Sequence, residues 1–134
     1  MADDLWPDDF GHDEQKPPVL ILKEQAQLLS AKTRGLVLGW VESKPVPVSN
    51  DFWHNFYLQV PNLDDYLFNL FVVRHGVLGY PATVTIPTLK WHSNPESSDQ
   101  LTDVLRRIFN DAEVKKIVRS LLTQAQASLA TPSA

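Results

Sequence analysis

Residues 53–75 read WHNFYLQVPNLDDYLFNLFVVRH, and this stretch decides the fold. Residues 53–60 alternate, so that His54, Phe56 and Leu58 point to one face and their neighbours to the other. Residues 66–75 are rich in aromatic and β-branched side chains, which favour a central strand. Residues 61–65, Pro-Asn-Leu-Asp-Asp, are typical of a turn. The stretch therefore predicts two antiparallel strands joined by a short connection.

Two further strands are expected on either side of this pair. Residues 36–43 alternate in the same way, whereas residues 44–50 contain two prolines and predict a loop. Residues 80–86 predict a fourth strand, and Pro81 and Pro87 argue for an edge position there. Residues 92–96 are expected to form a polar loop. Short connections between consecutive strands favour an antiparallel meander.

Helices are expected before and after these strands. Apolar spacing predicts a helix over residues 18–34, which Gly35 ends. Ser97 and Gln100 match a capping box before an apolar stripe, and Asn110 and Glu113 repeat that pattern before a second stripe. The predicted fold class is α+β, with an N-terminal helix, a four-stranded antiparallel meander and two C-terminal helices packed on the sheet.

A chain of 134 residues fits one domain, which we place at residues 18–126. Residues 1–17 are expected to form a disordered acidic tail with aromatic anchors, and residues 127–134 a frayed C-terminus. The sequence has no cysteine and no apolar run near the ~20 residues that span a bilayer. The start of the chain lacks the basic and apolar parts of a secretory signal, so a cytoplasmic location without membrane contact is expected.

The net charge of −4 is unevenly distributed. Residues 1–16 hold six acidic residues against Lys16 alone, whereas the remainder holds ten acidic and eleven basic residues. A nearly neutral body makes nucleic acid an unlikely partner.

The tail is the most distinctive feature of the sequence. Carboxylates keep it soluble, while two aromatic side chains four residues apart can anchor it on a groove. The candidate partner-binding residues are Leu5, Trp6, Asp8, Asp9 and Phe10. The alternative is a disordered leader that only solubilises the protein.

Histidines are the only candidates for acid–base chemistry in the body. The strand pairing places His54 opposite residues 72–74 rather than opposite His75, so a structural role is favoured for both. If the curved sheet encloses a pocket, His54, Tyr57 and Arg74 are its candidate polar groups.

Five cations on the last two helices form a candidate anion patch. They are Arg106, Arg107, Lys115, Lys116 and Arg119. A solvated helix face is the simpler interpretation and is favoured. No metal-binding, phosphate-binding or nucleophile motif is found, so we expect no catalytic residue, no metal and no cofactor.

Parts of the body resemble a family of small bacterial proteins with no assigned activity. The similarity runs through residues 21–29 (ILKEQAQLL), 32–33, 35–37, 56–58, 70–71 and 80–84 (YPATV). It covers roughly residues 18–125 and not the tail. The resemblance implies a bacterial source and supplies no catalytic residue.

Three functions stay open at this point. The leading prediction is a non-enzymatic bacterial protein–protein interaction module, such as an immunity-type or antitoxin-like inhibitor or an adaptor. The second is a small-molecule-binding domain or minor enzyme with a pocket between sheet and helix. The third is a secretion or assembly chaperone, which predicts a homodimer.

Overall fold

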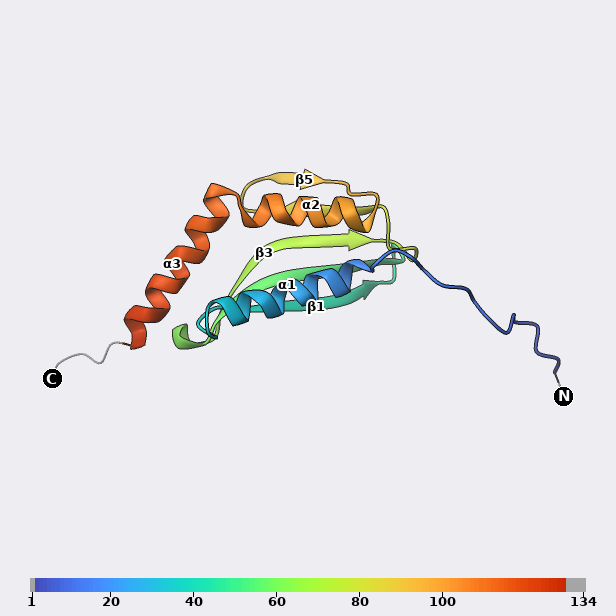
Figure 1. Ribbon diagram of the computed structural model, residues 1–134, viewed down its shortest axis with the longest axis horizontal. Coiled ribbons are helices and arrows are strands. Elements are labelled where there is room, and N and C mark those ends of the chain that lie inside the picture. Colours follow the sequence, from blue (N-terminus) through green and yellow to red (C-terminus); the bar gives the residue numbers. More distant parts are fainter. Residues whose placement is uncertain (1, 130–134) are drawn as a thin grey trace.

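The computed structural model describes residues 2–129 of the chain (Figure 1). Its elements in chain order are α1 (Pro18–Lys32), β1 (Leu38–Val46), β2 (Asp51–Val60), η1 (Pro61–Leu63), β3 (Tyr66–His75), β4 (Ala82–Ile86), β5 (Trp91–Ser93), α2 (Ser98–Phe109) and α3 (Ala112–Leu129). The α+β class is confirmed.

The sheet is an antiparallel meander in the order β1-β2-β3-β4-β5. The prediction of four strands is wrong by one, because Trp91–Ser93 pairs with β4 and occupies the edge that we expected β4 to form. The loop expected at residues 44–50 is shorter than predicted, since β1 continues to Val46. Pro45 is tolerated there because β1 is an edge strand, where one side of the backbone needs no ladder partner.

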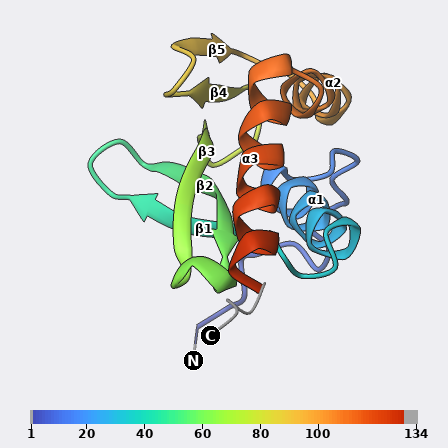
Figure 2. The same ribbon diagram turned by 90° about the vertical axis from the view of Figure 1, so that its left-hand side faces the viewer.

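The helices α1, α2 and α3 lie on one side of the sheet, and no helix within residues 2–129 covers its other side (Figure 2). The register pairs Phe56 with Phe71 and then Tyr57 with Asn69, which leaves Leu70 unpaired in a β-bulge. Both Leu70 and Phe71 are buried as a result. The bulge thus adds one apolar side chain to the core where a regular strand would turn it outward.

The starts and ends of the helices follow local chemistry. Ser97 caps α2 by accepting a hydrogen bond from the backbone N–H of Gln100 at 3.1 Å. The prediction that Asn110 caps α3 is wrong. Asp111 accepts the N–H groups of Glu113 at 2.9 Å and Val114 at 3.3 Å, whereas the amide of Asn110 donates to the last turn of α2.

Both ends of the domain contact its body. In the N-terminal segment, Gln15 Oε1 accepts hydrogen bonds from Ser98 N and Oγ at 2.8 and 2.9 Å, and Tyr80 OH donates to the Lys16 carbonyl at 2.6 Å. Residues 127–129 belong to α3, and Ser128 Oγ donates to the Asn62 carbonyl. The rest of the predicted frayed end, residues 130–134, lies outside the described residues.

Candidate functional site

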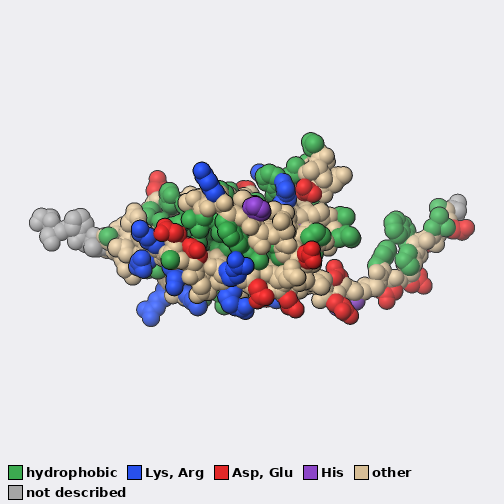
Figure 3. Space-filling view, turned by 90° about the horizontal axis from the view of Figure 1, so that it is seen from above, with side chains coloured by type: hydrophobic (Ala, Val, Ile, Leu, Met, Phe, Trp, Pro, Cys, Tyr) green, Lys and Arg blue, Asp and Glu red, His purple; other side chains and the backbone are tan. Residues whose placement is uncertain are grey.

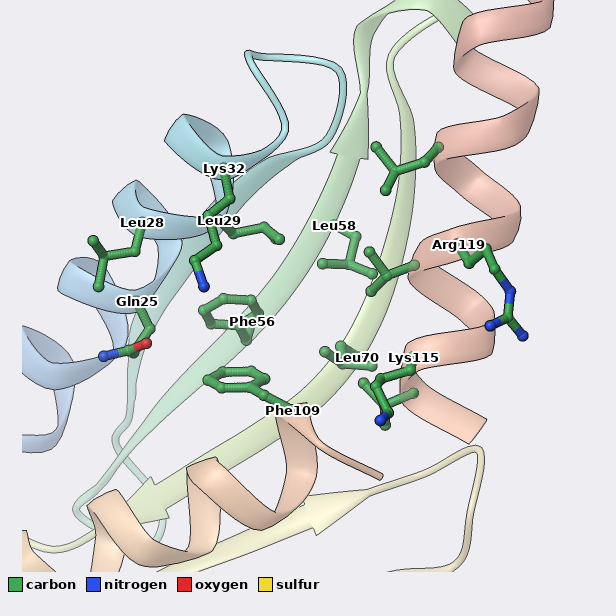
Figure 4. A pocket seen from close by; sticks show the side chains of 13 residues that line it. Gln25, Leu28, Leu29, Lys32, Phe56, Leu58, Leu70, Phe109, Lys115 and Arg119 are labelled. Carbon is green, nitrogen blue, oxygen red and sulfur yellow. The ribbon is translucent and has the colours of Figure 1, made fainter. Parts of the chain in front are cut away.

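A groove of about 450 Å³ lies between α1 and α3, above the middle of the sheet (Figure 4). Its walls are mainly apolar: Leu28 and Leu29 come from α1, and Val114, Val118 and Leu122 from α3. Phe56, Leu58 and Leu70 form the floor, and Phe109 closes one end. We call this feature the α1–α3 groove.

The groove exists because the two helices are seated over different strands. α1 packs closely on β1, where a side chain at Gly39 would bring its Cβ to 2.5 Å from Ala26 Cα. α3 is held at the far end of β2 and β3, because Asn62 in η1 bonds to the Ala125 carbonyl and accepts from Ser128. The centre of the sheet is therefore left uncovered between them.

The floor of the groove is stiffened at one end by three aromatic rings. Phe56 and Phe71 stack at 4.8 Å between centroids, and Phe109 tilts against both at 5.9 and 6.0 Å. Such contacts add to the free energy of area burial and fix the ring orientations. A ligand would meet a preformed wall at this end.

Three cations, Lys32, Lys115 and Arg119, line the groove together with the amide of Gln25. All three are exposed, and within residues 2–129 none of them has a carboxylate oxygen within 4 Å. No carboxylate occurs among the described lining residues. The groove therefore combines apolar walls with a positive rim.

The five-cation patch expected from the sequence is divided by the structure. Lys115 and Arg119 line the groove, whereas Arg106 pairs with Asp103 at 2.9 Å and Arg107 lies over the Trp91 ring at 5.8 Å. Lys116 is exposed and does not line the groove. Helix periodicity turns neighbouring cations in different directions.

Sequence reasoning missed Lys32 as a site residue. Its spacing from Gln25, Leu28 and Leu29 places all four on one face of α1, and all four line the groove. Lys115, Val118, Arg119 and Leu122 repeat the same spacing on α3. The α1 stripe thus holds two leucines and one cation, and the α3 stripe holds two apolar residues and two cations.

His54, Tyr57 and Arg74, the candidate pocket residues, do not converge. His54 points to the helix side of the sheet and is 4% exposed. Tyr57 and Arg74 lie on the other face, where Tyr57 contacts Trp40 at 5.3 Å and Arg74 lies over Trp53 at 5.8 Å. Alternation along β2 separates His54 from Tyr57, so no single pocket can use all three.

His54 and His75 are in direct contact. His54 pairs with Val73, as the register predicted, yet its Nε2 lies 2.7 Å from Nε2 of His75. His54 Nδ1 lies 2.6 Å from Ser43 Oγ, and His75 Nδ1 lies 2.7 Å from the Gly76 carbonyl. Long side chains reach their diagonal neighbours across a strand pair, so the register alone does not predict this contact.

The contacts of the two rings form one continuous chain of hydrogen bonds. A carbonyl only accepts, so His75 Nδ1 donates to the Gly76 carbonyl. In the tautomer in which His54 Nε2 donates to His75 Nε2, His54 Nδ1 accepts from the Ser43 hydroxyl. Burial, followed by the charges of His75 and Lys23, lowers the pKa of His54 to about 4.

A second cavity, of about 290 Å³, adjoins the two histidines and is bordered by Asp13, Gln15 and Tyr80. Burial and the nearby Asp13 carboxylate raise the pKa of Tyr80 to about 12, so its hydroxyl stays a donor to the Lys16 carbonyl. This cavity lies where the N-terminal segment joins the body. Its polar groups are largely engaged with one another.

The free face of the sheet carries a row of polar contacts between its aromatic residues. Asn69 donates to Asn55 at 3.1 Å, and Asn55 donates to Glu42 at 3.4 Å, each pair crossing adjacent strands. Trp53 Nε1 and Asn69 Oδ1 are buried without a partner among the described residues. This face is amphipathic. Neither of the two cavities described above opens on it.

The candidate partner-binding residues of the tail lie clear of the body (Figure 3). Leu5, Trp6 and Phe10 are 91%, 73% and 76% exposed, and Asp8 and Asp9 are exposed beside them. The Trp6 and Phe10 rings lie 5.9 Å apart. Asp4 and Asp9 accept hydrogen bonds from backbone N–H groups two residues on, so local turns, not a helix, bring the rings together.

Comparisons with protein families, with curated proteins and with solved structures gave no match to this chain. Within residues 2–129 no helix has both the length and the apolar character to cross a membrane. The description of the site therefore rests on the geometry alone.

Proposed function

We propose that this chain is a non-enzymatic protein-binding module that takes an acidic peptide segment with large apolar side chains into the α1–α3 groove. The observation that carries the proposal is the combination of apolar walls with three rim cations that have no carboxylate partner among residues 2–129. Apolar anchors gain free energy from burial, and carboxylates beside them meet Lys32, Lys115 and Arg119.

A peptide segment fits this groove better than a small molecule does. Small ligands are mostly held in cavities that bury nearly all of their surface. The groove instead lies between two helices over an open sheet, which is the arrangement that accepts an amphipathic segment with anchors at helical spacing (Figure 4).

The histidine chain supports a non-enzymatic function. Ser43, His54 and His75 are linked as the members of a hydrolase triad are, but the third group is an imidazole instead of a carboxylate. It provides no negative charge to stabilise an imidazolium on His54. A histidine with a pKa of about 4 is also a weak base for activating a hydroxyl at neutral pH.

The proposal is tested by titrating peptides into the full chain carrying Trp6→Ala and Phe10→Ala, so that its own anchors do not compete. The probes are 12-residue peptides of unrelated sequence, with two aromatic residues four apart among four or more Asp or Glu residues. Fluorescence anisotropy should show saturable binding that weakens as salt rises from about 0.05 to 0.5 M, because rim charges are screened.

Two controls decide between the alternatives. The same peptides with lysine in place of each acidic residue should not bind, because they would meet the rim with like charge. Dodecanoate, an amphipathic anion, tests the small-molecule alternative. Tight binding of dodecanoate with no binding of the acidic peptides would replace the proposal by a small-molecule-binding function.

A further inference from the structure

We infer that the α1–α3 groove is occupied by the acidic tail of a second copy of this chain, with Trp6 and Phe10 as anchors. The inference rests on the proposed function, because it requires the groove to bind an acidic aromatic segment. It goes further by naming the segment and by making self-association compete with any other partner.

The tail matches the groove in both of its properties. Its three large apolar residues are exposed, and two of them already lie side by side with their rings 5.9 Å apart. Asp4, Asp8 and Asp9 stand next to these anchors, opposite in charge to Lys32, Lys115 and Arg119. Leaving the anchors in water forgoes the free energy that their burial would provide.

The geometry favours the tail of another copy over the chain's own tail. Gln15 is tied to Ser98, so Phe10 has five residues of free chain, which span at most ~17 Å. Gln25 and Leu28, which line the groove, lie ~10 and ~15 Å along α1 from Pro18. To enter its own groove, the tail would have to reverse its direction and fold back along α1, whereas it leaves the body pointing away from that helix (Figure 1).

The shape of the molecule agrees with an exchange between copies. The tail leaves the body at the end where α1 begins, whereas α3 lies toward the opposite end (Figure 1). Two copies related by a two-fold axis can each place a tail in the partner's groove. Such an exchange closes on itself and gives a dimer, not a filament.

The test uses two variants, each of which lacks one half of the contact. Trp6→Ala with Phe10→Ala removes the anchors and keeps the groove; Lys115→Glu with Arg119→Glu reverses the rim and keeps the tail. Sedimentation velocity should show a concentration-dependent dimer for the wild type and for the control Lys116→Glu, and monomers for both double variants. A monomeric wild type, or a dimeric anchor variant, would overturn the inference.

Mixing the two variants shows whether the contact forms between copies. The rim-reversed chain, labelled through a single cysteine added after Ala134, should bind saturably to the anchor variant and not to itself. Absence of this binding overturns the inference. The peptide titration is independent of this result. Peptide binding without complementation overturns the inference and leaves the proposed function standing. Complementation without peptide binding supports the inference and shows that the groove takes the tail of another copy but no unrelated acidic peptide.

Discussion

At the residue scale, Gly39 sets the position of α1 and therefore one wall of the groove. An added Cβ would lie 2.5 Å from Ala26 Cα and 2.7 Å from its carbonyl oxygen, both backbone atoms that cannot turn aside. Gly39→Ala should lower the free energy of unfolding by roughly 1–3 kcal/mol, the usual cost of overpacking. Urea denaturation measures the change.

Gly76→Ala is the matched control for this substitution. No atom lies within 4 Å of its added Cβ, and its backbone has no left-handed φ, so the change should stay within about 0.5 kcal/mol. Equal effects at the two glycines would refute the close packing of α1 on β1.

His54 makes stability depend on pH. The folded protein keeps this ring neutral down to about pH 4, whereas the unfolded chain takes up a proton near pH 6.5. Its contribution is therefore complete above pH 6.5 and is lost as the pH falls toward 4, by at most about 3 kcal/mol. The contribution of His54 is isolated by measuring the free energy of unfolding of the wild type and of His54→Gln between pH 7 and 4 and comparing the two.

The free energy of unfolding of the two proteins should diverge as the pH falls. The wild type should lose more stability on acidification than His54→Gln, since glutamine takes up no proton. Parallel profiles would mean that His54 is not held neutral by its surroundings.

At the scale of elements, Asp111 decides where α3 begins. It accepts two N–H groups of the first turn, so Asp111→Ala should cost about 1 kcal/mol. Asp111→Asn keeps a capping oxygen and should stay close to wild type in thermal melting. If Asn destabilises as much as Ala, the carboxylate charge and not the cap is responsible.

The aromatic anchors of the tail can be replaced without affecting the fold. Trp6 and Phe10 are 73% and 76% exposed, so replacing both by alanine should change the monomer's free energy of unfolding by less than about 0.5 kcal/mol. Self-association should be lost in the same variant, because the anchors that enter the partner's groove are removed. Differential scanning calorimetry, at a concentration where the wild type is monomeric, checks that the stability of the monomer is unchanged. A large drop in melting temperature would show that the tail packs on its own body.

The sequence predicted a helix or strand correctly where its periodicity and its capping or turn residues lie within one continuous segment. The register of β2 against β3 and the capping residue of α2 follow from residues 53–75 and from Ser97. β5 was missed because three residues with a polar centre show no periodicity, and its strand character comes from pairing with β4. The bulge at Leu70 was missed for a similar reason, since an unpaired residue is defined only against its partner strand.

At the scale of the whole molecule, the groove could not be predicted because its two walls are far apart in sequence. The stripes on α1 and α3 each read as an ordinary core face, and their cations as helix ends or solvated charges. Only the seating of α1 on β1 and of α3 on η1 sets the two stripes on either side of an uncovered sheet. The tail, in contrast, could be recognised from its composition alone.

The central claim is that an acidic aromatic segment binds in the groove. Lys115 and Lys116 are adjacent exposed cations on α3, but only Lys115 lines the groove, so reversing either one changes the net charge equally. The decisive measurement is the affinity of one acidic peptide for the anchor variant carrying Lys115→Glu or Lys116→Glu. We predict a loss of about tenfold or more for Lys115→Glu and little change for Lys116→Glu, because only the former places like charge beside the ligand. Equal losses for the two would contradict the account.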